Sequence, residues 1–344
     1  MSVVLVTGGA GYVGSHAVKA MAAAGRDVVV LDNLSAGHRE AIDRIARAYP
    51  ERSIELVEGD TADRVLVART LERTAPSAVM HFAAWLSVPD SVRNPAGYYR
   101  NNVVGTLTLL EAMVSAGVRR FVFSSTCAVF GEPQHVPIEE SHPRSPVNAY
   151  GETKLVIEKA LEHFDSAYGL RSVALRYFNA AGADPDGLLG EDHDPEIHLI
   201  PRAIMAACGG EALQIFGDDY PTPDGTCQRD YIHVTDLARA HLLALARLEA
   251  GGGSAVYNLG NGTPVSVREV IDAVSRISGV QVPFVMSARR PGDPARLVGS
   301  SALAQRELGW EPAHASLDAI VETAWRWHAA HPRGYAVAQE SPAS

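Results

Sequence analysis

The first half of the chain alternates short apolar runs with amphipathic stretches. The apolar runs, rich in β-branched residues, cover residues 2–6, 27–31, 54–57, 78–81, 120–123 and 172–175. Between them, hydrophobic positions recur with a helical period over residues 12–24, 38–48, 63–73, 98–116 and 149–168. Strands with almost no polar alternation are buried on both faces. The pattern therefore predicts an α/β fold, with a doubly wound parallel sheet covered by helices.

This alternation of apolar runs and amphipathic stretches ends at about residue 179. Segments rich in Gly, Pro and Asp, at residues 182–195 and 217–225, interrupt shorter periodic pieces. We expect a first domain over residues 1–178, with a return segment around 230–260, and a smaller C-terminal α/β domain over 179–344. Gly251-Gly-Gly-Ser254 is predicted to be a flexible surface turn, and residues 332–344 to be frayed.

Composition and charge exclude several classes of function. Thirty Lys and Arg against forty Asp and Glu give a net charge of −10, and no basic run is present, so nucleic acid and anionic membranes are excluded as partners. Cys127, Cys208 and Cys227 lie far apart without a C-x-x-C spacing, as expected where thiols stay reduced. No stretch approaches the ~20 apolar residues of a membrane span. We expect a cytoplasmic protein.

A glycine cluster follows the first predicted strand and opens the first predicted helix. It reads Gly8-Gly-Ala-Gly11-Tyr-Val-Gly14. Glycine permits both a tight turn and a close approach of the backbone to a pyrophosphate, which the amides and dipole of the helix would then hold. With this strand and helix context, the cluster predicts a Rossmann-like dinucleotide site.

Two carboxylates follow the next strands. Asp32 ends the second predicted strand, where it would accept hydrogen bonds from the adenosine ribose and repel a 2′-phosphate, so NAD is favoured over NADP. Asp60-Thr61, after the third strand, could reach the adenine or could merely begin the next helix.

A phenol and an ammonium share one face of a later predicted helix. Tyr150-Gly-Glu-Thr-Lys154 places them four residues apart. A phenol with a usual pKa of ~10 is a poor base at neutral pH, but a neighbouring lysine charge and a positively charged nicotinamide favour the phenolate. Ser124-Ser-Thr126 ends the preceding strand, where a hydroxyl could bind the reacting oxygen of a substrate. Together these groups predict proton transfer.

The glycine-rich loop, the Ser/Thr strand end and the Tyr-x-x-x-Lys pair follow one another along the chain in an order that resembles the extended short-chain dehydrogenase/reductase superfamily. Within this superfamily the chain resembles the UDP-glucose 4-epimerase family. The resemblance runs from about residue 3 to residue 335. It rests on Val6-Thr-Gly-Gly-Ala-Gly-Tyr-Val-Gly-Ser-His16, Leu31-Asp-Asn-Leu34, His81-Phe-Ala-Ala84, Tyr98-Tyr-Arg-Asn-Asn102, Arg176-Tyr-Phe-Asn179, Ile215-Phe-Gly-Asp-Asp-Tyr-Pro-Thr222, Arg229-Asp-Tyr-Ile-His233 and Arg289-Arg-Pro-Gly-Asp293.

The resemblance implies a role for each matching residue. The NAD site would be lined by Gly8, Gly11, Tyr12, Val13, Gly14, Asp32, Asn33, Asp60, Thr61, Phe82, Ala83, Ala84, Asn101, Ser124, Tyr150, Lys154 and Tyr177. Tyr150 would be the catalytic base, Lys154 its electrostatic partner and ribose anchor, and Thr126 would contact the sugar. The UDP-sugar would be held by Asn179, His198, Leu199, Phe216, Arg229, Arg290 and Asp293. Homodimerisation through residues 98–116 and 149–168 is also implied.

The implied activity is an isomerase that interconverts UDP-glucose and UDP-galactose. The hydrogen at carbon 4 of a hexose is not acidic, so the centre must be oxidised transiently before hydride returns to its opposite face. Related dehydratases carry an Asp-Glu pair after the strand-end Thr, whereas this chain reads Thr126-Cys127-Ala128. Elimination would lack its acid and base, and this absence favours epimerisation.

Several alternatives stay open at this point. Phe130, Leu86 and His198 depart from the residues frequent in the family, and Leu297 falls near the position thought to gate N-acetylated sugars. UDP-N-acetylglucosamine, UDP-xylose or UDP-arabinose could be the substrate, and a net NAD-dependent sugar-nucleotide oxidoreductase is a further alternative.

Other chemically capable residues are given plainer interpretations. Arg229 beside Asp230 could be a surface ion pair. Glu191-Asp-His-Asp194 carries metal-ligand chemistry, but we interpret it as a solvated acidic loop and expect no metal. His233 and His241 are expected to be packed or surface residues.

Overall fold

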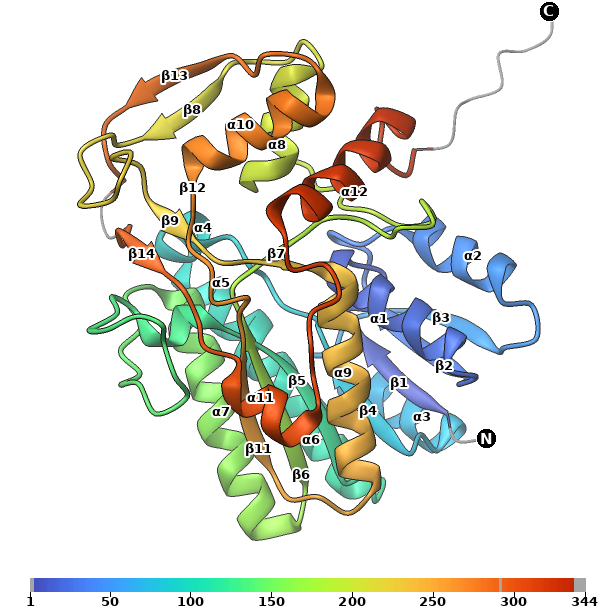
Figure 1. Cartoon of the computed structure of the whole chain (residues 1–344). Helices are drawn as coiled ribbons and strands as arrows, with labels where there is room; N and C mark the ends of the chain where they lie inside the picture. Colours follow the sequence, from blue (N-terminus) through green and yellow to red (C-terminus); the bar gives the residue numbers. More distant parts are fainter. Residues whose placement is uncertain (1–2, 291–292, 337–344) are drawn as a thin grey trace, which may run out of the picture.

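We describe a computed structural model of the chain over residues 3–290 and 293–336 (Figure 1). The strands are β1 Val4–Thr7, β2 Val28–Asp32, β3 Ile54–Glu58, β4 Ala78–His81, β5 Arg120–Thr126, β6 Arg171–Tyr177, β7 Asn179–Ala181, β8 Leu213–Phe216, β9 Gln228–Arg229, β10 Tyr231–His233, β11 Ala255–Leu259, β12 Val265–Ser266, β13 Phe284–Ser287 and β14 Arg296–Leu297. The helices are α1 Tyr12–Ala23, α2 Arg39–Ala48, α3 Arg64–Thr74, α4 Val88–Arg93, α5 Pro95–Tyr98, α6 Gly105–Ser115, α7 Ala149–Tyr168, α8 Leu199–Ala207, α9 Val234–Glu249, α10 Val267–Ser278, α11 Ala302–Leu308 and α12 Leu317–Ala330, with a π-helical η1 Tyr99–Val104 and a 3₁₀ η2 Cys127–Phe130.

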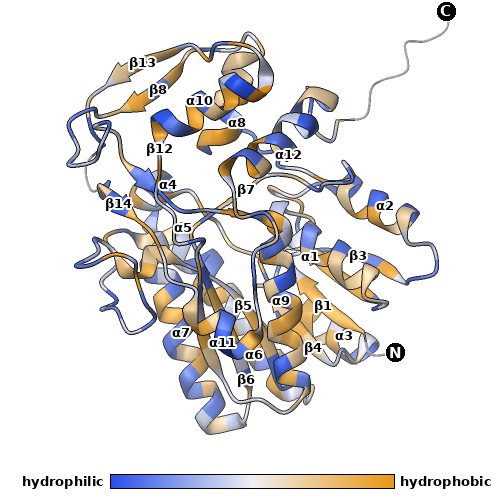
Figure 2. Cartoon of the chain, in the orientation of Figure 1, coloured by the Kyte–Doolittle hydropathy of each residue, from blue (hydrophilic) through white to orange (hydrophobic). Residues whose placement is uncertain are grey.

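The predicted doubly wound parallel sheet is confirmed. Its strands run in the order β11-β6-β5-β4-β1-β2-β3, and every neighbouring pair is parallel. The apolar faces of α1, α2 and α9 pack on one side of the sheet, and those of α3, α6 and α7 on the other. Figure 2 shows β1 in the orange of hydrophobic residues and the helices in two colours, as expected for helices with one apolar face. Because all strands are parallel, their carboxyl ends share one edge, where ligands bind in such folds.

The sheet takes in a strand that the apolar runs did not reveal. β11, residues Ala255–Leu259, pairs with β6 after α9 has crossed the sheet. The turn before it, predicted to be flexible, is held: the Ser254 hydroxyl accepts from Ser172 N at 2.9 Å and donates to Asp165 at 2.6 Å. The division of the chain at residue 178 stays a prediction.

The long helix predicted over residues 98–116 is divided in the structure. It consists of α5, the π-helical η1 and α6. The side chain of Asn102, inside η1, accepts from Trp85 N at 2.9 Å and donates to Trp85 O at 3.1 Å. The wider turn therefore brings a polar side chain to the loop after β4, and single π-turns of this kind are frequent at functional sites.

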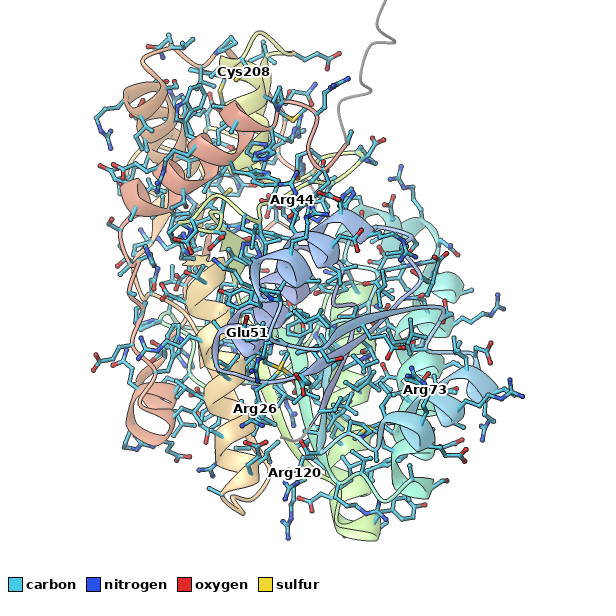
Figure 3. All side chains as sticks on the ribbon, turned by 90° about the vertical axis from the view of Figure 1, so that its right-hand side faces the viewer. Arg26, Arg44, Glu51, Arg73, Arg120 and Cys208 are labelled. Atoms are coloured by element: carbon cyan, nitrogen blue, oxygen red, sulfur yellow. The ribbon has the colours of Figure 1, made fainter. Side chains whose placement is uncertain are left out.

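A second apolar core lies under the C-terminal part of the chain. It is built from α8, α10 and α12 with strand β8, and the exposed strand β13 pairs with β8. Cys208, which ends α8, lies at the outer end of this part (Figure 3). The predicted fraying does not apply to residues 332–336, because Tyr335 is buried and its hydroxyl bonds Gly190 O at 3.2 Å. Residues 337–344 lie outside the described residues. None of the described helices is both long and apolar enough to span a membrane.

Candidate active site

The glycine loop joins β1 to α1, and its glycines serve different purposes. A Cβ on Gly8, where φ is +72°, would lie 2.3 Å from Ala83 N, and a Cβ on Gly14 would lie 2.1 Å from Gly8 O. A Cβ on Gly11 would meet only Gly8 O, at 3.5 Å, so open space lies beside this residue. Gly8 and Gly14 are therefore required by packing, whereas Gly11 leaves room for something outside the chain.

The start of α1 has the donors that an anion needs. Gly11 is its N-cap and provides no side-chain hydrogen bond, so no cap satisfies the leading amides of the helix. The open space beside Gly11 lies at this helix start. Amides and helix dipole together suit the pyrophosphate of a dinucleotide, and this part of the site fits NAD.

The two carboxylates predicted to bind adenosine lie close together. Asp32, buried at the end of β2, accepts from Ala10 N and Leu34 N, both at 2.9 Å, and burial raises its pKa. Asp60 accepts from the Asn33 side chain at 2.9 Å and from Ala62 N at 2.8 Å. A carboxylate oxygen can accept more than one bond, so Asp32 and Asp60 keep acceptor capacity toward ribose and adenine hydrogen-bond donors. Thr61, which begins the following turn, is buried.

Several other predicted cofactor residues follow the carboxyl ends of the central strands. Phe82, Ala83 and Ala84 come directly after β4, and the Phe82 ring packs on His241 at 4.6 Å. Asn101, in η1, donates to the Asn102 side chain at 2.9 Å. Tyr12, at the start of α1, instead donates its hydroxyl to Gly182 O at 2.6 Å. This bond ties the glycine loop to the segment that follows β7.

Tyr150 and Lys154 lie in the first turns of α7, beside the end of β5. Lys154 is buried, donates to Ser124 O at 2.8 Å, and lies 6.0 Å from the centroid of the Tyr150 ring. An ammonium has three donors, so this one bond leaves it able to bind a ribose as well. The Ser124 and Tyr177 hydroxyls are hydrogen-bonded to one another, and the Thr126 hydroxyl accepts from Ala128 N at 3.2 Å.

The electrostatics of this pair differ from the sequence expectation. Burial raises the pKa of Tyr150 well above its usual value, and the neighbouring Tyr177 adds to the rise, while a hydrogen bond from Thr126 opposes it. Burial also lowers the pKa of Lys154 to about 7, against the pull of Glu158. In the chain alone, burial therefore disfavours the charged forms of both Tyr150 and Lys154.

The residues predicted to hold UDP come from β7, the start of α8, β8, β9 and the segment between β13 and β14. Arg229, in β9, donates to Asp293 and to two backbone carbonyls, those of Gln228 and Pro294. Its partner is thus Asp293 and not the adjacent Asp230, so the alternative of an Arg229–Asp230 surface pair is wrong. Arg290 lies over the Phe216 ring, 3.7 Å from its centroid. This stack places a cation beside an aromatic face of the kind that a uracil could share.

Asn179, at the start of β7, donates to Asp230 O at 3.1 Å. His198 and Leu199 lie where α8 begins, with His198 as its N-cap. Pro291 and Gly292 of the Arg289-Arg-Pro-Gly-Asp293 motif lie outside the described residues.

The loop before α8 is not the solvated acidic loop that we expected. The Glu191 side chain is only 3% exposed, and it lies 2.6 Å from His198 Nδ1 and 3.3 Å from His193 Nδ1. Burial alone would lower the pKa of His193, but Glu191 and Glu196 raise it to about 9. His233 and His241 are buried, as one of the two expected interpretations had it.

Sequence reasoning missed a buried ion pair behind the catalytic candidates. Glu158, one helical turn after Lys154, accepts from Arg176 at 2.5 and 2.9 Å and from Ser125 at 2.6 Å. Asp230 was also missed as an acceptor: its carboxylate binds the amides of Asn261, Gly262 and Gly299. No spacing rule joins residues so far apart along the chain, so only the fold could reveal these contacts.

Comparison with known proteins gives consistent matches. Residues 4–260 match the NAD dependent epimerase/dehydratase family. A UDP-glucose 4-epimerase of Lacticaseibacillus casei is 49% identical over 333 residues, covering 96% of this chain and 98% of that protein. The crystal structure of UDP-glucose 4-epimerase from Brucella ovis in complex with NAD matches with a TM-score of 0.90 and 51% identity. The match covers 95% of this chain and 98% of that one. That of UDP-glucose-4-epimerase from Stenotrophomonas maltophila, with bound NAD and formylated UDP-arabinopyranose, has a TM-score of 0.93 and 41% identity, covering 97% and 99%.

Proposed function

Because this chain belongs to the NAD dependent epimerase/dehydratase family, we propose how its own residues carry out the family's chemistry on a UDP-sugar. The chain is an isomerase that interconverts UDP-glucose and UDP-galactose with NAD as its cofactor. The observation that carries the assignment of residues is the position of Tyr150 and Lys154 on one face of α7, beside the strand end with Ser124 and Thr126.

The cofactor would be held from three sides. The amides that follow Gly11 would bind the pyrophosphate, Asp32 the adenosine ribose, and Lys154 the nicotinamide ribose. When bound, NAD supplies the chemistry of taking up and returning the hydride of carbon 4. The remaining work falls to the protein, which must move one proton and keep the sugar free to turn.

Tyr150 would move that proton. In the chain alone burial keeps its hydroxyl protonated, so it needs an added positive charge beside it before it can accept the proton of the 4-hydroxyl. Lys154 would supply part of that charge once a ribose and a carbonyl hold its ammonium in place. Thr126 would orient the same sugar oxygen toward the phenol. The pair is therefore basic only in the loaded site.

The site must bind the nucleotide tightly and the sugar loosely. The Arg229 guanidinium uses three of its five N–H donors on Asp293, Gln228 and Pro294, so two donors remain, already oriented, for a diphosphate. Arg290 and Phe216 would bind the uracil end, Asp293 the uridine ribose, and Asn179, His198 and Leu199 would complete the grip. A firm hold on the nucleotide leaves the pyranose free to present both faces.

A direct assay tests this assignment. Purified protein incubated with UDP-galactose should form UDP-glucose without net consumption of NAD, because the cofactor is regenerated in each cycle. No product with or without supplementary NAD would refute the assignment. Tyr150→Phe should lose turnover by orders of magnitude and still retain NAD. Sustained growth of NADH absorbance with excess NAD would instead indicate a net oxidoreductase, and an unimpaired Tyr150→Phe enzyme would remove Tyr150 from its role.

The range of sugars has one specific alternative. The Stenotrophomonas maltophila relative was solved with a formylated UDP-arabinopyranose, and this favours testing pentoses next to hexoses. Leu297, half-buried in β14 and packed against the cluster around Phe130 and Phe178, would set the size of the sugar pocket. Relative turnover of UDP-galactose, UDP-N-acetylglucosamine and UDP-arabinose measures this choice.

We also propose that the chain is a cytoplasmic homodimer. The three cysteines are free, as suits a reducing compartment. Around η1 and α7 the surface exposes apolar side chains: Val92, Tyr99, Val104, Val147 and Tyr168. Val92 lies in α4, Tyr99 and Val104 in η1, Val147 just before α7 and Tyr168 at its end. Exposed apolar groups on and beside the helices of the expected interface suit contact with a second copy of the chain. Sedimentation velocity of the purified protein tests the dimer.

A further inference from the structure

Two histidines and two glutamates converge in the loop that joins β7 to α8. They are Glu191, His193, Glu196 and His198, and one ligand atom from each lies within 4.8 Å of the others. The loop runs beside the first helix of the sheet domain, where the His193 ring meets the Tyr12 ring edge-on at 6.2 Å. The cluster therefore lies between the glycine loop and the start of α8, and the mechanism above uses only His198 from it.

The four groups lie at ion-pair distance from one another, yet three of their buried atoms lack a well-aligned hydrogen bond. Glu191 Oε1 lies 2.6 Å from His198 Nδ1 and 3.3 Å from His193 Nδ1. All three atoms are buried, and none has a hydrogen-bond partner of acceptable geometry. An imidazolium paired with a carboxylate aims its N–H at the oxygen. Here one ligand atom from each of the four side chains lies within 4.8 Å of the others, and the Glu191 side chain is almost wholly buried.

This arrangement is the one expected of metal ligands. Lone pairs of neutral imidazoles and of carboxylates all point at the ion, and the two carboxylate charges balance a divalent cation. Tetrahedral bonds of about 2.0–2.2 Å to zinc place ligand atoms roughly 3.4 Å apart. The separations here run from 2.6 Å to at most 4.8 Å, so closure around an ion requires side-chain shifts of about 1 Å. We propose that Glu191, His193, Glu196 and His198 bind a divalent transition metal ion, with zinc the first to be tested.

The surrounding contacts hold these ligands in place. Glu196 Oε1 accepts from the amides of Ile197 and His198, both at 2.8 Å, which leaves Oε2 facing His193. The indole of Trp327 donates to Glu191 O at 3.1 Å. Outer contacts that orient ligands are typical of metal sites. With four protein ligands, the site is structural: it would fasten the loop and the start of α8 to the rest of the chain.

Metal analysis of the full chain tests the proposal. The protein is purified on a tag without histidine, and its metal content is measured by mass spectrometry. It is then stripped with a chelator and titrated with Zn²⁺, Mn²⁺ and Co²⁺. We expect about one equivalent of metal per chain, a melting temperature that rises by several degrees on reloading, and visible Co²⁺ bands typical of a low-coordinate nitrogen and oxygen site.

Matched variants assign the ligands. Glu191→Gln and His193→Ala should each lower the metal affinity at least tenfold, whereas Asp194→Asn, an exposed acid in the same loop, should bind like the wild type. Circular dichroism confirms that each variant is folded, and Glu196→Gln replaces Glu191→Gln if the latter is not. The proposal is overturned if the stripped protein binds none of the three ions at stoichiometric concentration. It is also overturned if folded Glu191→Gln and His193→Ala proteins bind as tightly as Asp194→Asn.

Discussion

Alanine at Gly11 should weaken NAD binding and leave the fold intact. The Cβ at this position would touch only Gly8 O, at 3.5 Å, which is an ordinary contact, and φ is −77°. Alanine is a poorer N-cap than glycine but restricts the unfolded chain more, by about 0.4–1 kcal/mol, so the two effects largely cancel. We therefore expect a free energy of unfolding within about 1 kcal/mol of wild type.

The effect on NAD follows from the space beside Gly11. A methyl group there occupies the volume in which a phosphate would approach the amides of α1. Loss of one charge-assisted hydrogen bond costs about 1.5–3 kcal/mol, which is roughly a 10- to 150-fold weaker affinity. The assay is NAD titration followed by calorimetry, with thermal unfolding of the cofactor-free protein measured in parallel.

Gly14→Ala is the matched control for this prediction. Its Cβ would lie 2.1 Å from Gly8 O, so the helix must move, at a cost of about 1–3 kcal/mol in the free energy of unfolding. The two variants should therefore show different defects: Gly11→Ala should lose affinity for NAD, and Gly14→Ala should lose free energy of unfolding. A Gly11→Ala protein that binds NAD as tightly as wild type would refute the placement of the pyrophosphate.

Three further perturbations test other parts of the molecule. Arg290→Ala should raise KM for UDP-galactose about tenfold or more with little change in kcat, because it removes a cation from the nucleotide and not from the sugar, and steady-state kinetics measures the split. Val104→Glu should convert a dimer to a monomer in sedimentation velocity, since it places a charge among the exposed apolar residues. Burial lowers the pKa of His241 to about 4, so the neutral ring stabilises the fold above pH ~6.5 and this stabilisation is lost as the pH falls through about 4. In His241→Leu, the free energy of unfolding should therefore fall by about 3 kcal/mol less between neutral pH and pH ~4 than in the wild type. Unfolding measured as a function of pH tests this, and an unchanged pH profile would contradict the assignment.

Features that depend on residues close together along the chain were predicted well from the sequence. The first strands and helices follow from apolar periodicity, and the predicted helix over residues 149–168 coincides with α7. The glycine loop and Tyr150 with Lys154 are likewise local patterns whose spacing carries their geometry. What the local patterns did not show involves tertiary contacts: Asn102 in η1 bonds Trp85, and β11, within the return segment expected around residues 230–260, pairs with β6.

Charge was the hardest property to predict from the sequence. Composition marks Glu191 and Glu158 as ordinary acids, yet both are buried, one against histidines and the other against Arg176. Likewise, a lysine four residues from a tyrosine predicts an activated phenol, whereas burial opposes the charge on both groups. Desolvation depends on every neighbour in space, so no spacing along the chain can indicate it.

Because Tyr150 and Lys154 are buried, the basicity of Tyr150 depends on whether cofactor and substrate are bound. Each group is neutral more readily in the protein interior than in water, so proton transfer is disfavoured until other charges enter. The bond from Lys154 to Ser124 O already fixes the ammonium nitrogen, and a bound ribose would add acceptors that favour its charged form. We therefore predict that Tyr150 acts as a base only after the cofactor has bound, and that a chain without NAD binds the nucleotide end of the substrate without abstracting its proton.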